Sequence, residues 1–289
     1  MDLETEIRHR TIVTNGVRLH VVEAGPEDGP LLILLHGFPE FWYSWRRQIG
    51  PLAAAGYRVQ VPDQRGYNLS SKPRRVSSYN LDRLAKDVLG LIDEAGVAKA
   101  RVVGHDWGAL VGWWLGIRYP QTLERLALLN VPHPLVMQRA LMLSSAQRKR
   151  SRYMFFFQLP WLPERIFTRN NFAYAEKSLR VSSQPGTFSD DDLARYKEAW
   201  SQPRAVRSMI HWYRAALRAR PPQPKNPRVT GVPTLLIWGT QDRFLGKELA
   251  QPSIDLCDHG RLELIPEATH WVQLEEPERV NRLLVDFLG

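Results

Sequence analysis

Apolar residues recur along this chain with two different spacings. Short continuous apolar runs, of which residues 31–35 are the clearest, are typical of strands buried on both faces by helices. Between these runs lie longer stretches with helical spacing, which stop at glycines such as Gly56 and Gly96. The pattern therefore predicts alternating strands and helices. In order, we expect strands at 31–35, 57–61, 102–103, 126–130, 233–238 and 261–265, and helices at 44–56, 80–96, 107–119, 247–256 and 277–288.

Two segments depart from this alternation. Residues 7–24 alternate polar and apolar side chains around Asn15-Gly16, which predicts an antiparallel hairpin. The alternation also stops after 126–130, which is then the sixth strand, and pieces of helical character follow. These pieces are expected at 152–157, from Ser189 onward through a capping sequence, and at 203–220.

The second departure ends at the proline-rich residues 221–227, which we expect to form a stiff linker. The fold class is therefore α/β, with a mostly parallel sheet flanked by helices and a helical cap inserted after the sixth strand. Ligands of such sheets bind beyond the carboxyl ends of the strands, where the cap would form a roof. We expect a first core part at 1–132, the cap at 133–226 and a second core part at 227–289.

Composition narrows the class of protein. A hydrophobic content of 44% over 289 residues suits one folded α/β unit, and no apolar run reaches the roughly 20 residues of a membrane span. Residues 1–6 are acidic and lack the apolar stretch of a secretory signal. The single cysteine, Cys257, allows no internal disulfide and gives no metal cluster. We expect a cytoplasmic protein without a metal ion.

The chain carries a formal charge of +9 and an isoelectric point near 9.8, which raises the question of nucleic-acid binding. The basic residues are scattered, however, and the densest run, residues 148–152, is accompanied by no nucleic-acid motif. Such a run is usually a solvated face. We therefore expect no nucleic-acid partner, and a monomer or a homodimer.

The strongest chemical signal surrounds Asp106. The pattern Gly104-x-Asp106-x-Gly108 has the spacing of a nucleophile elbow, G-x-S-x-G, with a carboxylate in place of the serine. Small residues flank the tip because a sharp strand-to-helix turn leaves little room for a Cβ atom. The alternative is that Asp106 only caps the following helix.

Two further residues follow in the order that an elbow nucleophile requires. Asp242 stands just past the strand at 233–238, and His270 just past the strand at 261–265. The aspartate would hold the imidazole tautomer and leave Nε2 as a base. Asn130 also ends a strand, but it carries no charge and competes poorly as the orienting acid.

A carboxylate nucleophile defines the class of reaction. It would form an ester on the enzyme, which water activated by His270 then hydrolyses. The oxyanion that develops on Asp106 would be stabilised by the backbone N–H groups of Trp107 and Phe38. Carboxylates suit saturated carbon with a leaving group, either a carbon–halogen bond or a strained epoxide, whereas an esterase would need a hydroxyl at Asp106.

Four phrases of the sequence carry a resemblance to a known family. The phrases His36-Gly-Phe-Pro-Glu40 and Gly104-His-Asp-Trp-Gly108, with those of the cap, resemble the soluble epoxide hydrolases of the α/β-hydrolase fold over nearly the whole chain. The resemblance implies that Tyr153, in Tyr-x-x-x-Phe-Gln-x-Pro, and Tyr213, in Trp-Tyr-Arg, donate to the epoxide oxygen. Opening an epoxide makes an alkoxide, and a phenol with a pKa of about 10 remains protonated and can donate to it.

The alternative is a haloalkane or haloacid dehalogenase with the same aspartate nucleophile. Haloalkane dehalogenases typically carry asparagine where this chain has Phe38, and fluoroacetate dehalogenases carry arginines where it has Trp107 and Leu110. Both departures favour conversion of a small hydrophobic epoxide to a vicinal diol, without a cofactor. A ligand receptor derived from such an enzyme would be expected to lose part of this set. We expect several aromatic side chains to line an apolar pocket or the seam between cap and core: Phe155, Phe156, Phe157, Trp161 and Trp212.

Overall fold

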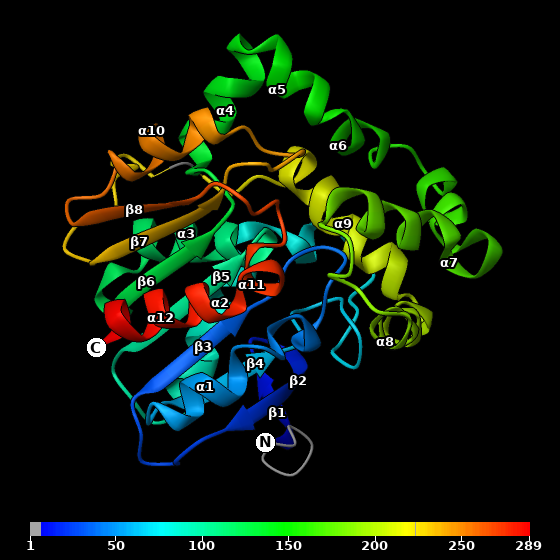
Figure 1. The fold of residues 1–289 in the computed structure, drawn as a ribbon. Coiled ribbons are helices and arrows are strands. Elements are labelled where there is room, and N and C mark those ends of the chain that lie inside the picture. Colours follow the sequence, from blue (N-terminus) through cyan, green and yellow to red (C-terminus); the bar gives the residue numbers. More distant parts are fainter. Residues whose placement is uncertain (1–6, 223) are drawn as a thin grey trace.

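An eight-stranded sheet forms the centre of the protein in a computed structural model, which describes residues 7–222 and 224–289 (Figure 1). The strand order is β1-β2-β4-β3-β5-β6-β7-β8, with antiparallel pairing from β1 to β4 and parallel pairing beyond. The mostly parallel sheet is therefore confirmed, whereas the expectation for residues 1–6 lies outside the described residues. The strands are β1 (Arg8–Thr14), β2 (Val17–Ala24), β3 (Leu31–Leu35), β4 (Arg58–Pro62), β5 (Ala100–His105), β6 (Leu123–Leu129), β7 (Thr234–Gly239) and β8 (Gly260–Ile265).

The apolar runs form the buried centre of this sheet. Every residue of β3 is at most 3% exposed, because strands pair on both its edges and helices cover both its faces. At the sheet edge, the predicted hairpin is confirmed, with Thr14 paired to Val17 and positive φ angles at Asn15 and Gly16.

Helices lie on both faces of the sheet, with α1 packed on α12 and α2 packed on α3 (Figure 1). The helix expected at 44–56 is wrong in its first half, where a short 3-10 turn at Trp42–Trp45 precedes α1. Pro51 has no N–H to donate, so it fits only the first turn of a helix, and α1 begins just before it. The helices that flank the sheet are α1 (Ile49–Ala54), α2 (Leu81–Glu94), α3 (Trp107–Arg118), α10 (Ala250–Ile254), α11 (Val272–Glu275) and α12 (Pro277–Leu288).

Between β6 and β7 the chain forms a helical insertion, residues 134–218, which Figure 1 shows to one side of the sheet. The helices expected at 152–157, from Ser189 and at 203–220 are present, and the Ser189 cap is confirmed by its reciprocal hydrogen bonds with Asp192. Three more, α4, α5 and α7, were not predicted. The division of the chain into core and cap at 132 and 226 remains a prediction. The helices of the insertion are α4 (Pro134–Leu143), α5 (Ser145–Arg150), α6 (Arg152–Phe156), α7 (Leu162–Ser182), α8 (Asp190–Ser201) and α9 (Ala205–Arg218).

Within the described residues, no helix combines the length and the apolar character that crossing a bilayer requires.

Candidate active site

Asp106 occupies the sharp turn between β5 and α3. Its backbone has φ 49° and ψ −121°, and its side chain makes no capping hydrogen bond to α3, so the helix-cap alternative is wrong. The flanking glycines are required by close approach: a Cβ on Gly104 would lie 2.4 Å from the Gly108 carbonyl oxygen. A Cβ on Gly108 would lie 2.1 Å from the oxygen of Leu35. The turn therefore holds Asp106 out at the end of the sheet at the cost of backbone strain.

The loop after β3 meets this carboxylate. The N–H of Phe38 donates to Asp106 Oδ1 at 2.7 Å. Gly37 allows the approach, since a Cβ there would lie 2.3 Å from the Cβ of Asp106. Trp107 is the first residue of α3, where the helix offers its N–H no acceptor from a preceding turn. These two N–H groups are the sequence-predicted oxyanion donors.

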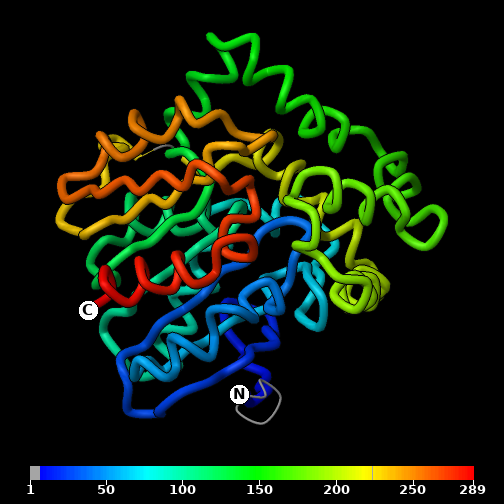
Figure 2. Tube along the Cα trace, viewed as in Figure 1, coloured from blue at the N-terminus to red at the C-terminus, as the bar shows by residue number. Residues whose placement is uncertain are grey.

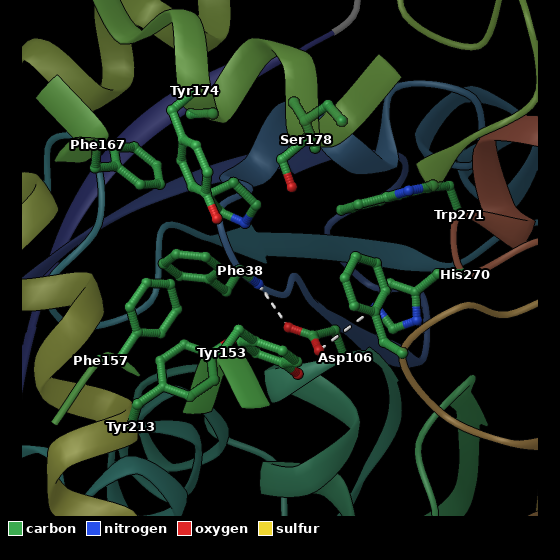
Figure 3. A pocket seen from close by; sticks show the side chains of 14 residues that line it. Phe38, Asp106, Tyr153, Phe157, Phe167, Tyr174, Ser178, Tyr213, His270 and Trp271 are labelled. Atoms are coloured by element: carbon green, nitrogen blue, oxygen red, sulfur yellow. Dashed lines mark hydrogen bonds and ion pairs between the residues drawn. The ribbon is translucent and has the colours of Figure 1, made fainter. Parts of the chain in front are cut away.

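His270 lies between the two aspartates, as the chain order predicted. Its Nδ1 is 2.7 Å from Asp242 Oδ2, and its Nε2 is 3.5 Å from Asp106 Oδ2 (Figure 3). Asp242 also accepts the backbone N–H groups of Phe244 and Leu245 at Oδ1. The structure thus brings Asp106, Asp242 and His270 together, although 164 positions separate the first from the last.

The sequence suggested that His105 shapes its loop through hydrogen bonds, but it gave no supporting role to Asn130 or Glu40. Asn130 at the end of β6 donates to Asp242 Oδ2 at 2.9 Å, so it orients the acid although it is not the acid itself. Beneath His270, the ring of His105 lies 2.8 Å from both the His270 carbonyl oxygen and Glu40 Oε2. Glu40 Oε2 also accepts the N–H of Gly37. A buried network therefore joins the loop of Phe38 to the loop of His270, and no local sequence signal marks contacts of this range.

The two aspartates govern the charge of His270. Burial by itself would lower the pKa of the imidazole, but the negative charge of Asp242 and the hydrogen bonds that His270 donates to Asp106 and Asp242 raise the pKa to about 10. Burial would raise the pKa of the Asp106 carboxyl, but the hydrogen bond and charge of His270 outweigh burial and lower it. At neutral pH the free site therefore holds an imidazolium between two carboxylates.

This raised pKa makes stability depend on pH. Because the folded pKa of about 10 exceeds the ordinary value of 6.5, the stabilisation is complete below pH 6.5 and is lost as the pH rises towards 10. Urea unfolding should therefore show the free energy of unfolding falling, over this range, by a few kcal/mol more in the wild type than in His270→Gln. Parallel pH curves for the two proteins would contradict the assignment.

Two tyrosines of the insertion lie beside Asp106. Tyr153 from α6 and Tyr213 from α9 have ring centroids 5.8 Å apart, and Figure 3 shows them on the side of Asp106 away from His270. Burial, with the charge of Asp106, raises the pKa of Tyr153, and burial raises the pKa of Tyr213 well above 10. Both phenols therefore remain protonated over the physiological range and can donate.

Arg214 and Gln158 join the chain segments that carry the two tyrosines. Arg214 donates to the carbonyl oxygens of Phe157 and Leu159, which follow Tyr153. Gln158 Nε2 donates to the carbonyl oxygen of Tyr213 at 3.0 Å. Hydrogen bonds thus join the segment that follows Tyr153 to the segment around Tyr213, and they hold both phenols in position.

Apolar cavities surround the carboxylate. One of about 100 Å³ is lined by Asp106, both tyrosines and His270, with apolar walls that include Phe157 and Trp271. A second of about 80 Å³ shares Asp106, Tyr153 and Tyr213 with the first and extends between Leu110 and Met137.

Of the aromatic residues expected to wall a pocket or the seam, Phe157 lines the first cavity, and Trp212 is buried with its N–H donated to Arg65 O. The expectation is wrong for Phe155 and Trp161, which are 55% and 65% exposed. Apolar character alone did not reveal that both face outward.

Across residues 7–222 and 224–289, no three His, Cys, Asp or Glu side chains gather in a way that could hold a metal ion.

Comparison with known proteins agrees with this geometry. A family model of the α/β hydrolase fold matches residues 30–277. AB hydrolase superfamily protein YfhM of Bacillus subtilis (strain 168) is 45% identical over 98% of this chain and 98% of its own length. Epoxide hydrolase 4 of Homo sapiens is 38% identical over 96% of this chain and 77% of its own length. The crystal structure of Bacillus megaterium epoxide hydrolase in complex with an inhibitor matches with a TM-score of 0.88 and 32% identity, over 96% of this chain and 99% of that one. The chain therefore belongs to the α/β-hydrolase fold family, within its epoxide hydrolase group.

Proposed function

We propose that the protein converts a small hydrophobic epoxide and water to a vicinal diol through a hydroxyalkyl ester on Asp106. The observation that carries this proposal is that the buried phenol of Tyr213, the half-buried phenol of Tyr153 and one carboxylate share an apolar cavity. A halide departs without a proton, whereas an epoxide oxygen needs one, so paired phenols favour an epoxide over a carbon–halogen bond. The helical insertion then acts as a cap that completes the pocket over the sheet.

In the first step, an oxygen of Asp106 attacks a ring carbon and the carbon–oxygen bond of the epoxide breaks. Tyr153 and Tyr213 donate to the departing oxygen, so that a hydroxyl forms in place of an alkoxide. Ester formation neutralises Asp106. Because the charge and hydrogen bond of Asp106 help to raise the pKa of His270, that pKa falls at this point. The imidazolium can then return a proton to the phenolate and become a neutral base.

In the second step, His270 takes a proton from water, and the hydroxide formed attacks the carbonyl carbon of the ester. The N–H groups of Phe38 and Trp107 stabilise the oxyanion, and Asp242 stabilises the imidazolium. The bond between the acyl carbon of Asp106 and the ester oxygen then breaks. His270 gives its proton to that oxygen, and the diol leaves. Asp106 regains its charge and the raised pKa of His270 is restored.

The source of the diol oxygen that does not come from the epoxide tests whether an ester forms on Asp106. In a single turnover in ¹⁸O-labelled water, the first diol should carry an unlabelled oxygen from Asp106, and the label should appear in Asp106 after peptide digestion. Label in the first diol would exclude the ester. Chloride release from a chloroalkane, measured beside diol formation from a styrene-type epoxide, distinguishes a dehalogenase from an epoxide hydrolase. Diol formation without chloride release is the result that we expect.

The phenols are tested by removing their hydroxyls. Tyr153→Phe and Tyr213→Phe together should lower kcat for diol formation by roughly 10²–10⁴-fold, because the epoxide oxygen then loses both of the phenol donors beside Asp106. Stopped-flow assay of ester formation measures the affected step. Tyr174→Phe is the matched control: Tyr174 lines the same cavity but is 49% exposed, and its loss should change kcat by less than about threefold. Unchanged turnover in the double variant would remove both tyrosines from the reaction.

A further inference from the structure

One part of the helical insertion holds a large share of the net positive charge of the protein. Residues 134–169, here called the insertion arm, hold seven Lys or Arg side chains against one acidic residue, Glu164, a formal charge of +6 out of +9 for the whole chain. All seven basic side chains are exposed. Figure 2 shows the arm as the outer rim of the molecule, with no other part of the described chain beyond it.

The same arm exposes apolar side chains. Their exposed fractions run from 36% for Leu162 to 82% for Leu143, although burying them would be favourable. Two of them, Phe155 and Trp161, are aromatic residues that the sequence predicted to wall an apolar pocket or the seam between cap and core. Six such side chains lie on the arm: Met142, Leu143, Phe155, Leu159, Trp161 and Leu162.

A basic groove adjoins the arm at Trp161. It has a volume of about 510 Å³ and is lined by Trp161 of the arm, by Arg207 and Arg218 of α9, and by Arg204, the residue before α9. Its one lining carboxylate, Glu164, accepts two hydrogen bonds from the buried Arg214 and lies 4.0 Å from the Nε of Arg207. The groove therefore offers cationic donors to an anionic group of phosphate size.

We propose that the insertion arm and this groove form a docking surface for an anionic lipid bilayer. Exposed apolar side chains interspersed with Lys and Arg suit the boundary between headgroups and acyl chains, and the charge complements anionic lipids. Four of the six apolar side chains are aliphatic, and these cannot stack on bases as a single-stranded nucleic acid would require. A second copy of the chain would bring the same +6 charge against itself.

Vesicle sedimentation of the full chain tests the proposal. Binding to vesicles of phosphatidylcholine with roughly one third phosphatidylglycerol should exceed binding to phosphatidylcholine alone by at least about tenfold, and should weaken in high salt. Replacing Arg148, Lys149 and Arg165 by Gln should lower the vesicle partition coefficient by at least about tenfold. Leu143→Ser with Trp161→Ser should lower it comparably without changing its salt dependence.

Matched control variants distinguish an effect of the insertion arm from an effect of net charge or exposed apolar surface anywhere on the protein. Replacing Arg47, Lys99 and Lys225, which are exposed on the rest of the molecule, by Gln makes the same change in net charge and should leave vesicle binding within about twofold. Val13→Ser, at 73% exposed on β1, is the apolar control. Urea unfolding of every variant should remain cooperative, with a midpoint close to that of the wild type, which shows that each one folds.

Several outcomes would overturn the proposal. These are equal binding to neutral and anionic vesicles, an equal loss in the control triple variant, and complete competition by soluble glycerol phosphate, which would indicate a phosphate site without a bilayer. Tighter binding of a single-stranded RNA than of anionic vesicles would assign the arm to nucleic acid. None of these measurements depends on the reaction at Asp106.

Discussion

Asp106→Ala should lose essentially all turnover, with kcat/KM for an epoxide lower by at least about 10⁵-fold, or about 7 kcal/mol of transition-state stabilisation. The reason is that Asp106 is the one carboxylate that lines this cavity among the described residues, and without it the ring carbon of the epoxide lacks the proposed nucleophile. Initial rates of diol formation, with purified variants at saturating and limiting substrate, measure the effect.

Two further variants serve as controls for Asp106→Ala. Asp106→Gly suits the positive φ of 49° better than alanine does, so it should fold at least as stably and be equally inactive. Asp93→Ala removes an exposed carboxylate from the end of α2 and should leave kcat/KM within about twofold. Residual activity of either Asp106 variant above about one per cent of wild type would exclude the covalent route.

His270→Gln should separate the two chemical steps. Ester formation needs Asp106 and the phenols, whereas ester hydrolysis needs the imidazole 3.5 Å from Asp106. We therefore expect one equivalent of epoxide to be consumed rapidly, followed by turnover slower by roughly 10⁴-fold or more. Intact-protein mass spectrometry should show an increase equal to the mass of the epoxide, located on the peptide that contains Asp106.

The matched control for this trapping experiment is the double variant Asp106→Ala with His270→Gln, which should gain no mass. An adduct on the double variant would show that another side chain reacts with the epoxide. Multiple-turnover kinetics without a burst in His270→Gln would show that the imidazole is needed already for ring opening, contrary to the proposed order of steps.

Local sequence patterns accounted for much of the core. The buried strands and the hairpin at Asn15 could be predicted because an uninterrupted apolar run or an Asn-Gly turn has few alternative solutions. The insertion was harder to predict. Its α7 contains four residues, 169–172, whose backbone leaves helical geometry, and its aromatic residues divide between cavity wall and solvent. Hydrophobicity does not distinguish these cases, because an exposed aromatic and a buried one look alike in one dimension.

What the sequence determined by itself was the chemistry available to the protein: a carboxylate on an elbow, an acid and a histidine after later strands, and two tyrosines in recognisable phrases. The tertiary structure alone decided that these groups meet, and how they are tuned. Asn130 on Asp242, the His105–Glu40 pair beneath His270, and Arg214 across the phrases of Tyr153 and Tyr213 all join residues far apart in the chain. Their effect depends on distance and burial in three dimensions. Electrostatic coupling between ionisable groups acts through space, so the order of residues cannot encode the raised pKa of His270 on its own.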